Sequence, residues 1–357
     1  MLTFVPDLTF YPAPDVKLNF QKSMAHSQST LPIVGAIAIA LWFILPAVQT
    51  PDTFSTIDYG LWQHLPTFLQ DGVWSLCLSA FCATLSVYIM AELNNTHNLL
   101  RVSSRMLGSM LAFLLAWAVP VHQFQPGCIV MLASLLAFFP LFSTYQVPSP
   151  ILSFSTHLIL SLASLVFPHL LWLIPVYWLI QKYFRSLSLR CFAASLLAIM
   201  LPYWFYGGIA LLTDHTRDYL SHLSAIISFH GYDYTQLSLN NLLIFAYMIL
   251  LFLSGAFDFF LHQYKDKTRT RLIYNAIILH GICLLLFIGF QPTFFYTLLA
   301  LLMVDTAIVF GHFFTLTHTK FSHIYCLILL LLGIVVLVLQ YLDHLQPTVS
   351  FLTDNIF

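Results

Sequence analysis

The amino-acid sequence predicts an all-α protein, a bundle of transmembrane helices that crosses a bilayer several times. Hydrophobic residues make up 59% of its 357 residues and charged residues only 8%, whereas a soluble domain carries about 25% charged residues. Several apolar runs also reach the roughly 20 residues that a helix needs to span a bilayer. So few charges cannot cover a water-facing surface, and we therefore expect a polytopic membrane protein.

About eleven apolar segments are expected to form the bundle. They cover residues 31–49, 73–93, 104–120, 128–143, 151–166, 168–184, 188–212, 238–262, 271–290, 293–315 and 322–342. The third to sixth are short for full spans, so a re-entrant path is an alternative for some of them. We divide the chain into a non-cleaved cytoplasmic tail (1–30), which lacks a signal-peptide core, a single transmembrane helical domain (31–345) and a short outer tail (346–357).

The positions of the basic residues predict the orientation of this bundle. Cytoplasmic connections carry an excess of Lys and Arg. If the N-terminus lies inside, every Lys and Arg except Arg217 falls in the tail, in an inner connection or at its flanks, while acidic residues such as Asp71, Asp233 and Asp343 fall outside. The sequence thus predicts an N-terminus inside and a C-terminus outside, in a bacterial cytoplasmic (inner) membrane.

The same charges predict a turn within the long apolar run 151–184. The basic connections at 101–105 and 182–190 must lie on one side, so an even number of crossings separates them. Segments 104–120 and 128–143 supply two crossings, and a single crossing by 151–184 would break this parity. Because proline disfavours helical geometry in the residue before it, we place the turn at Phe167-Pro168, on the outer side.

Composition and motifs exclude several functions. A net charge of −1 gives no reason to expect a nucleic-acid partner, and the six cysteines form no CxxC pair. The sequence contains no Gly-rich phosphate loop, no HExxH and no GxSxG. The lipid bilayer is therefore the one partner that composition itself predicts.

Asp214, Asp218 and His222 are the first candidate site. On a helix they would share one face, and carboxylates with an imidazole can bind a divalent metal ion or perform acid–base chemistry. Arg217 lies beside them and, with His222, is a candidate for substrate binding. The alternative is a solvated helix end at the outer interface.

The second candidate site is a set of ionisable residues inside apolar segments. Ionisable groups within a bilayer cost several kcal/mol and usually face a polar interior. Asp258 and His262 are four residues apart on one segment, Asp305 and His312 seven apart on another, and His280 lies between them in sequence. A proton or ion path is the functional interpretation, and interhelical hydrogen bonds that hold the bundle together are the alternative.

The stretch Phe154–Trp204, with its small-residue turn before Pro168, its basic loop and its Leu-Pro-Tyr end, resembles an uncharacterised family of bacterial multi-pass membrane proteins. The stretch Glu92–Phe113, with its Asn-Asn pair and Arg-containing connection, is similar to the same family. The resemblance covers most of residues 31–212 and brings no activity with it.

The layout also resembles the GT-C fold of polyprenyl-linked membrane glycosyltransferases. This resemblance implies an acidic residue in the first outer loop, here Asp52 or Asp58, as catalytic base or metal ligand, with Asp218 as a further catalytic residue and a polyprenyl-linked sugar as substrate. A divalent metal ion held by Asp214, Asp218 and His222 would serve such an enzyme. The Asp-x-Asp or Glu-x-Asp pair of that class is absent from residues 50–72.

Three functions follow from these observations. The chain is a multi-pass membrane protein without catalysis, a GT-C-like glycosyltransferase acting at the outer face, or an ion- or proton-coupled transporter. An enzyme needs the acidic residues of both long outer loops to meet above the membrane, whereas a transporter needs its polar residues enclosed at mid-depth.

Overall fold

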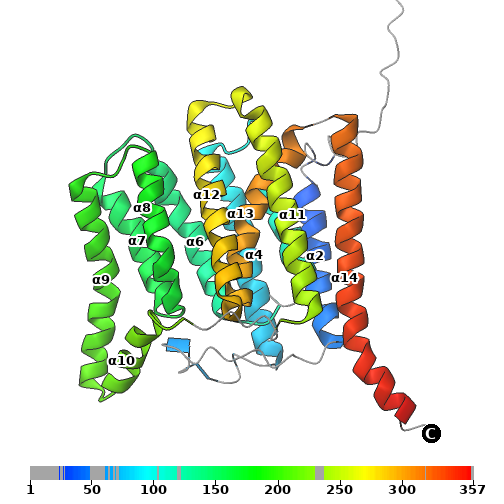
Figure 1. Ribbon diagram of the computed structural model, residues 1–357, viewed down its shortest axis with the longest axis horizontal. Helices are drawn as coiled ribbons and strands as arrows, with labels where there is room; N and C mark the ends of the chain where they lie inside the picture. Colours follow the sequence, from blue (N-terminus) through cyan, green and yellow to red (C-terminus); the bar gives the residue numbers. More distant parts are fainter. Residues whose placement is uncertain are drawn as a thin grey trace, which may run out of the picture.

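The computed structural model (Figure 1) describes residues 24, 27, 29–48, 61, 62, 65, 66, 69, 72–102, 104–118, 122–229, 237–317 and 319–354; for 45–48 and 341–354 it describes only the helical backbone. In these residues all regular structure is helical. The α-helices are α2 (Thr30–Val48), α4 (Gly72–His97), α5 (Met106–Trp117), α6 (Pro126–Ser143), α7 (Pro150–Ser164), α8 (Ile174–Tyr183), α9 (Leu189–Leu212), α10 (Thr216–Ala225), α11 (Leu239–His262), α12 (Thr268–Phe290), α13 (Phe295–Leu316) and α14 (Lys320–Asp354). Short 3-10 helices η3 (Pro168–Leu173), η5 (Gln263–Lys265) and η6 (Pro292–Phe294) join some of them.

Seven of the helical stretches in the described residues are long and apolar enough to cross a membrane. They cover 72–97, 126–143, 189–212, 239–265, 268–290, 292–316 and 320–340. The prediction of a multi-pass helical membrane protein is therefore confirmed. Helices start where the sequence supplies N-terminal signals: Ser188 and Ser238 accept hydrogen bonds from the backbone N–H three residues on, and Pro126 and Pro150 occupy first-turn positions.

Helix α13 is the centre of the bundle. It packs against α5, α6, α11 and α12, and every one of its residues except Tyr296 and Leu316 is buried. Close contact with α11 is possible because Gly255 has no side chain where the backbone of Val309 passes. A helix surrounded on all sides by protein can carry polar side chains at membrane depth, since they can find partners on its neighbours.

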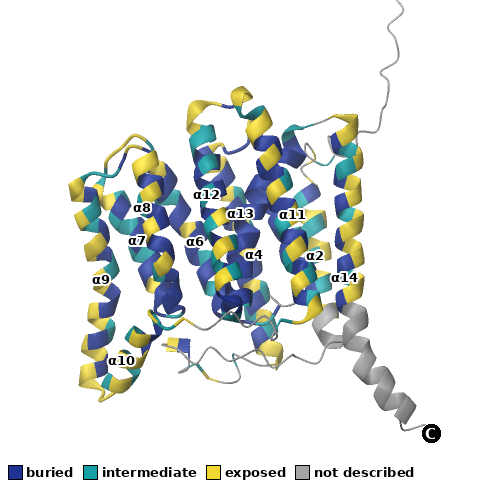
Figure 2. Cartoon of the chain, in the orientation of Figure 1, coloured by how far each residue is buried: buried dark blue, intermediate teal, exposed yellow. Residues whose placement is uncertain are grey.

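The outermost helices of the bundle are α9 and α14, at its two edges (Figures 1 and 2). Their exposed residues are mainly Leu, Ile, Val, Phe and Trp, as expected for surfaces that face lipid. Helix α14 is docked through its backbone, because Trp117 donates a hydrogen bond to the carbonyl of Gly333 and Tyr247 donates one to that of Leu329. The apolar span covers 320–340, close to the predicted last segment 322–342, and the helical backbone continues beyond it to Asp354.

The predicted turn at Phe167-Pro168 is confirmed. Helix α7 ends at Ser164 and η3 begins at Pro168. The chain reverses there, because Ser153 at the start of α7 hydrogen-bonds to Gln181 near the end of α8 at 3.3 Å. Helix α9 then runs parallel to α7, with Ser161 donating to the carbonyl of Ile199.

Helices α5, α7 and α8 are shorter than a bilayer is thick. Helix α5 has 12 residues, which gives about 18 Å of length, and all of them except Phe113 are buried. Irregular backbone at membrane depth is tolerated where protein encloses it. Burial by the longer helices therefore allows these segments to be short.

The bundle has two chemically different ends. At the end that we call the basic end, the connections after α4, α8, α11 and α13 gather, and every described Lys and Arg except Arg217 lies there or within the adjoining turns. Hydrogen bonds tie the connections at this end together: Arg101 with Asp266, Arg269 with His97, and Gln146 N–H of the α6–α7 connection with the carbonyl of Phe184. The opposite end holds α10 and the α7–η3 turn.

Candidate functional site

Asp305 and His280 form the most deeply buried ionisable pair of the described residues. Asp305 is near the middle of α13 and His280 near the middle of α12, and both side chains are essentially inaccessible to solvent. His280 Nδ1 lies 2.7 Å from Asp305 Oδ2. Aromatic rings enclose the imidazole, with the centroids of Tyr177 and Phe138 at 5.4 and 5.6 Å. The pair is therefore held in a dry environment at mid-depth.

This pair keeps two of its polar atoms without a hydrogen-bond partner among the described residues: Asp305 Oδ1 and His280 Nε2. With Nδ1 donating to the carboxylate, the neutral imidazole carries its basic lone pair at Nε2. A buried structural pair normally satisfies all its polar atoms. The Nε2 lone pair thus has no hydrogen-bond donor among the described residues.

A second ionic contact closes the basic end of α13. Asp266, in the short connection before α12, accepts a hydrogen bond from Arg101 Nε, and its other oxygen lies 3.3 Å from His312 Nε2. Burial by itself raises the pKa of Asp266, but His312 and Arg101 outweigh it and hold that pKa below its ordinary value. Asp266 is therefore a carboxylate at neutral pH. Arg101 reaches water, because about a third of its side chain is exposed.

Tyr274 lies between these two polar contacts. Its ring centroid is 4.5 Å from that of His312, and its hydroxyl has no hydrogen-bond partner in the described residues. It precedes His280 by six residues on α12, which is about 9 Å along the helix axis. His312 follows Asp305 by seven residues on α13. Tyr274 and His312 therefore lie on the basic-end side of the mid-depth pair.

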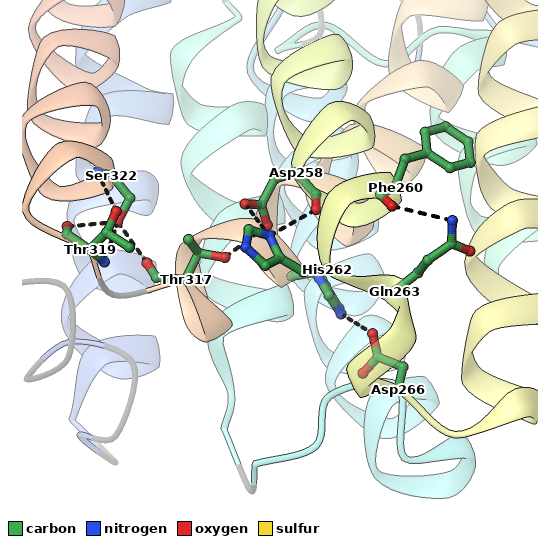
Figure 3. A network of polar contacts seen from close by, with 9 residues as sticks. Asp258, Phe260, His262, Gln263, Asp266, Thr317, Thr319 and Ser322 are labelled. Carbon is green, nitrogen blue, oxygen red and sulfur yellow. Dashed lines mark hydrogen bonds and ion pairs between the residues drawn. The ribbon is translucent and has the colours of Figure 1, made fainter.

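The third acid–imidazole contact lies at the end of α11 nearest the basic end. Asp258 lies 2.9 Å from His262 Nδ1, and Thr317 donates a hydrogen bond of 2.8 Å to the other carboxylate oxygen (Figure 3). His262 is partly exposed at this end. Figure 3 shows Asp266 as a separate neighbour of this group. The Asp258 contact therefore joins α11 to the α13–α14 connection and lies away from mid-depth.

A cleft of about 380 Å³ opens on the other side of the Asp305–His280 pair. It lies between η3–α8 and α12, and its walls are mostly aromatic and aliphatic; they include Trp172, Val176, Phe229, Cys283, Phe287 and Phe290. Phe229 and Phe290 belong to the end opposite the basic one. Val176 adjoins Tyr177, and Cys283 is one helical turn from His280 on α12. The cleft therefore runs from that opposite end to the neighbourhood of the pair.

These contacts show how the predicted intramembrane polar residues are arranged. Asp258, Asp305, His280 and His312 are buried as expected. Asp305 and His312, however, do not pair with each other, although they share one face of α13. Each meets a residue of another element, His280 and Asp266 respectively. The predicted single cluster is thus three separate acid–imidazole contacts.

The interpretation of Asp214, Asp218 and His222 as one helix face is wrong. Asp214 precedes α10 and has a left-handed backbone (φ 59°), so the assumed helix does not include it. His222 points away from water, with its ring centroid 5.7 Å from that of Tyr203 and 5.6 Å from that of Tyr206. Burial, and then the neighbouring His169, lower the pKa of His222 to about 4.

In the part of the chain that the structure describes, no group of three or more His, Cys, Asp or Glu side chains is placed to hold a metal ion. The predicted set of Asp214, Asp218 and His222 does not form such a group either, because His222 is buried while Asp214 is exposed. Arg217 is exposed on α10. Asp52 and Asp58 lie outside the described residues.

Sequence reasoning missed Asp266, Arg101, Tyr274 and Tyr177 as members of the polar network. One signal was available, because Asp266 is the only acid in a strongly basic connection, Lys265–Arg271. Asn94 was also missed. It shapes the connection that carries Arg101 by donating to the carbonyl of Ser104 and accepting from the N–H of Leu100.

Comparison with protein-family models, with curated proteins and with solved structures finds no match to this chain. The functional argument therefore rests on the geometry above.

Proposed function

We propose that this multi-pass membrane protein is a proton-coupled transporter in which the Asp305–His280 pair carries the coupling proton. One observation supports this most strongly: the pair is fully buried near the middle of α12 and α13, with His312 and Tyr274 on its basic-end side and a cleft toward the opposite end. Ionisable residues enclosed in this way are typical of proton and ion pathways.

The pair has two charge states. With a neutral imidazole and a carboxylate it carries one negative charge. When His280 Nε2 takes up a proton, the imidazolium and the carboxylate cancel. Because an uncompensated charge in a dry environment costs several kcal/mol, the two states favour different surroundings. Their interconversion is the step that would drive a change between two helix arrangements.

Access from the basic end would pass Arg101, Asp266 and His312. The Arg101–Asp266 contact closes this route in the present arrangement, while the cleft lined by Trp172 and Cys283 approaches the pair from the other end. A site closed on one side and approached on the other is what alternating access requires.

The orientation in the membrane is part of this proposal. We propose that all eleven segments cross a cytoplasmic (inner) membrane, with the N-terminus and the basic end in the cytoplasm. The concentration of Lys and Arg at one end supports this orientation. The cleft beside α8 and α12 then opens on the outer side.

Proton movement in proteoliposomes tests the function. The full chain is reconstituted with entrapped pyranine, and a potassium gradient with valinomycin drives protons inward. We expect protein-dependent proton entry that Asp305→Asn and His280→Gln abolish. Asp218→Asn, on α10 and away from the pair, is the matched control and should leave entry unchanged. Equal entry in the wild type and Asp305→Asn, or none above empty liposomes, would overturn the proposal.

A second candidate function is glycosyl transfer from a polyprenyl-linked sugar at the outer face. One observation favours it: the described parts of the α2–α4 and α10–α11 connections both reach the turn between α7 and η3. Leu61 N–H donates to the carbonyl of Leu165, and His169 at the start of η3 contacts the carbonyl of Ser228. Asp58→Ala and Asp218→Ala distinguish this function, because they should abolish sugar transfer and leave proton entry intact.

A further inference from the structure

We infer that the cleft between η3–α8 and α12 binds a lipophilic organic cation, which exchanges with the proton at the Asp305–His280 pair. This inference rests on the proposed function and names its substrate class. The cleft volume of about 380 Å³ lies within the range of sites for drug-sized ligands.

The walls of the cleft suit a cation with an apolar surface. They contain four aromatic side chains, from Trp172, Phe229, Phe287 and Phe290, and no lysine or arginine. The Trp172 and Phe229 rings form a T-shaped pair with centroids 5.1 Å apart at the outer part of the cleft. Aromatic faces attract cations, most strongly where water is excluded. An anion would find neither a positive charge nor a cluster of donors there.

The negative charge lies on Asp305, behind the wall of the cleft and not in its lining. Cys283 lines the cleft and follows His280, the partner of Asp305, by three residues on α12. Asp305 Oδ1 is fully buried and has no hydrogen-bond partner in the described residues. When the pair has released its proton, it carries one uncompensated negative charge. A cation in the cleft compensates that charge from one side, as a proton on His280 does from within.

This gives a balanced exchange. Binding of one organic cation favours release of one proton from His280 Nε2, and protonation of Nε2 favours release of the cation. No covalent bond other than the N–H bond is made or broken. The mouth residues Trp172 and Phe290 are themselves exposed on the outside of the bundle, so a lipophilic cation dissolved in the bilayer can enter from the membrane side.

Binding of radiolabelled tetraphenylphosphonium to the purified full-length protein in detergent tests the inference. We expect saturable binding by the wild type and at least tenfold weaker binding by Asp305→Asn. Trp172→Ala and Phe290→Ala, at exposed positions of the cleft where folding is unaffected by a core cavity, should each weaken binding severalfold. Trp204→Ala is the matched control, because Trp204 is an exposed aromatic residue of α9 away from the cleft.

Uncharged triphenylphosphine oxide separates a cation site from a merely apolar groove. It should not displace the labelled cation. Displacement by the neutral compound, equal binding by the wild type and Asp305→Asn, or no saturable binding at all would each overturn the inference. Cation binding in detergent and proton entry in liposomes are measured separately, so a wrong substrate class and a wrong function give different results.

Discussion

Arg101 and Asp266 are 165 residues apart in sequence and form an ion pair that joins the α4–α5 connection to the start of α12. The carboxylate is buried while the guanidinium is about one-third exposed. His312 approaches the same carboxylate from α13. Three elements of the basic end are therefore held by one acid, which also makes this contact the inner closure of the proposed transport route.

Removal of either partner should destabilise the protein. Breaking a fully buried ion pair costs about 3–5 kcal/mol, because the remaining charge is left without a partner. Since Arg101 is partly exposed and water screens it, we expect Arg101→Ala to lower the free energy of unfolding by about 1–3 kcal/mol. Thermal unfolding in detergent measures this. Arg217→Ala, at an exposed position of α10, is the control, and an equal loss in both variants would contradict the assignment.

His222 makes the stability depend on pH. Its pKa in the folded protein is about 4, below the value of about 6.5 for an exposed histidine. The unfolded chain therefore takes up a proton at a pH where the folded chain does not. Stability is fully present above about pH 6.5 and falls as the pH decreases toward 4.

This pH dependence is checked by thermal unfolding at pH 7.5 and at pH 5. We expect the wild type to lose stability between them and His222→Phe to lose less, because it has no imidazole to protonate. His215→Gln, an exposed histidine just before α10, is the matched control and should behave as the wild type. A parallel loss in His222→Phe would show that other groups cause the pH dependence.

The turn at Phe167-Pro168 shows which features the sequence predicts well. It follows from charge placement and from the backbone restriction before proline, both of which are local or additive along the chain. The positions of helices in the apolar segments can also be predicted, because they depend on local features of the sequence. The partners in the buried pairs do not follow from the sequence, because Asp305 and His312 share a helix face but Asp305 meets His280 of α12 and His312 meets Asp266 of the connection before α12. Their partners depend on the relative rotation and depth of four helices, which the period of one segment does not contain.

Asp214 illustrates a second limit of predicting a site from sequence spacing. Its spacing from Asp218 and His222 fits one helix face only if the helix is continuous. The backbone at Asp214 is left-handed, and α10 begins two residues later. Asparagine and aspartate adopt this conformation more readily than most residues, so the same residue that suggested a ligand instead ends the preceding turn.

The α11–α13 contact should not tolerate a methyl group at Gly255. A Cβ atom there would lie 2.8 Å from the carbonyl carbon and oxygen of Val309 and 2.9 Å from Cα of Phe310. Backbone cannot move aside as a flexible side chain can, so we expect Gly255→Ala to cost about 1–3 kcal/mol. The control is Gly289→Ala on α12, where a Cβ atom would have no neighbour within 4 Å. Unfolding of both variants in detergent is the measurement, and equal stability would contradict the close helix contact.

The last prediction concerns the two ends of the bundle. Arg185 and Arg217 are both exposed, and α9 separates them along its whole length. Helix α9 has 24 residues, about 36 Å, which is long enough to cross the hydrocarbon core. The basic end should face the cytoplasm. We expect Arg217→Cys, in a background without the six native cysteines, to react with a membrane-impermeant maleimide in intact cells. Arg185→Cys should react only after the cells are opened. Labelling of both in intact cells would contradict the orientation, and labelling of Arg185→Cys alone would reverse it and place the cleft beside α8 and α12 on the cytoplasmic side.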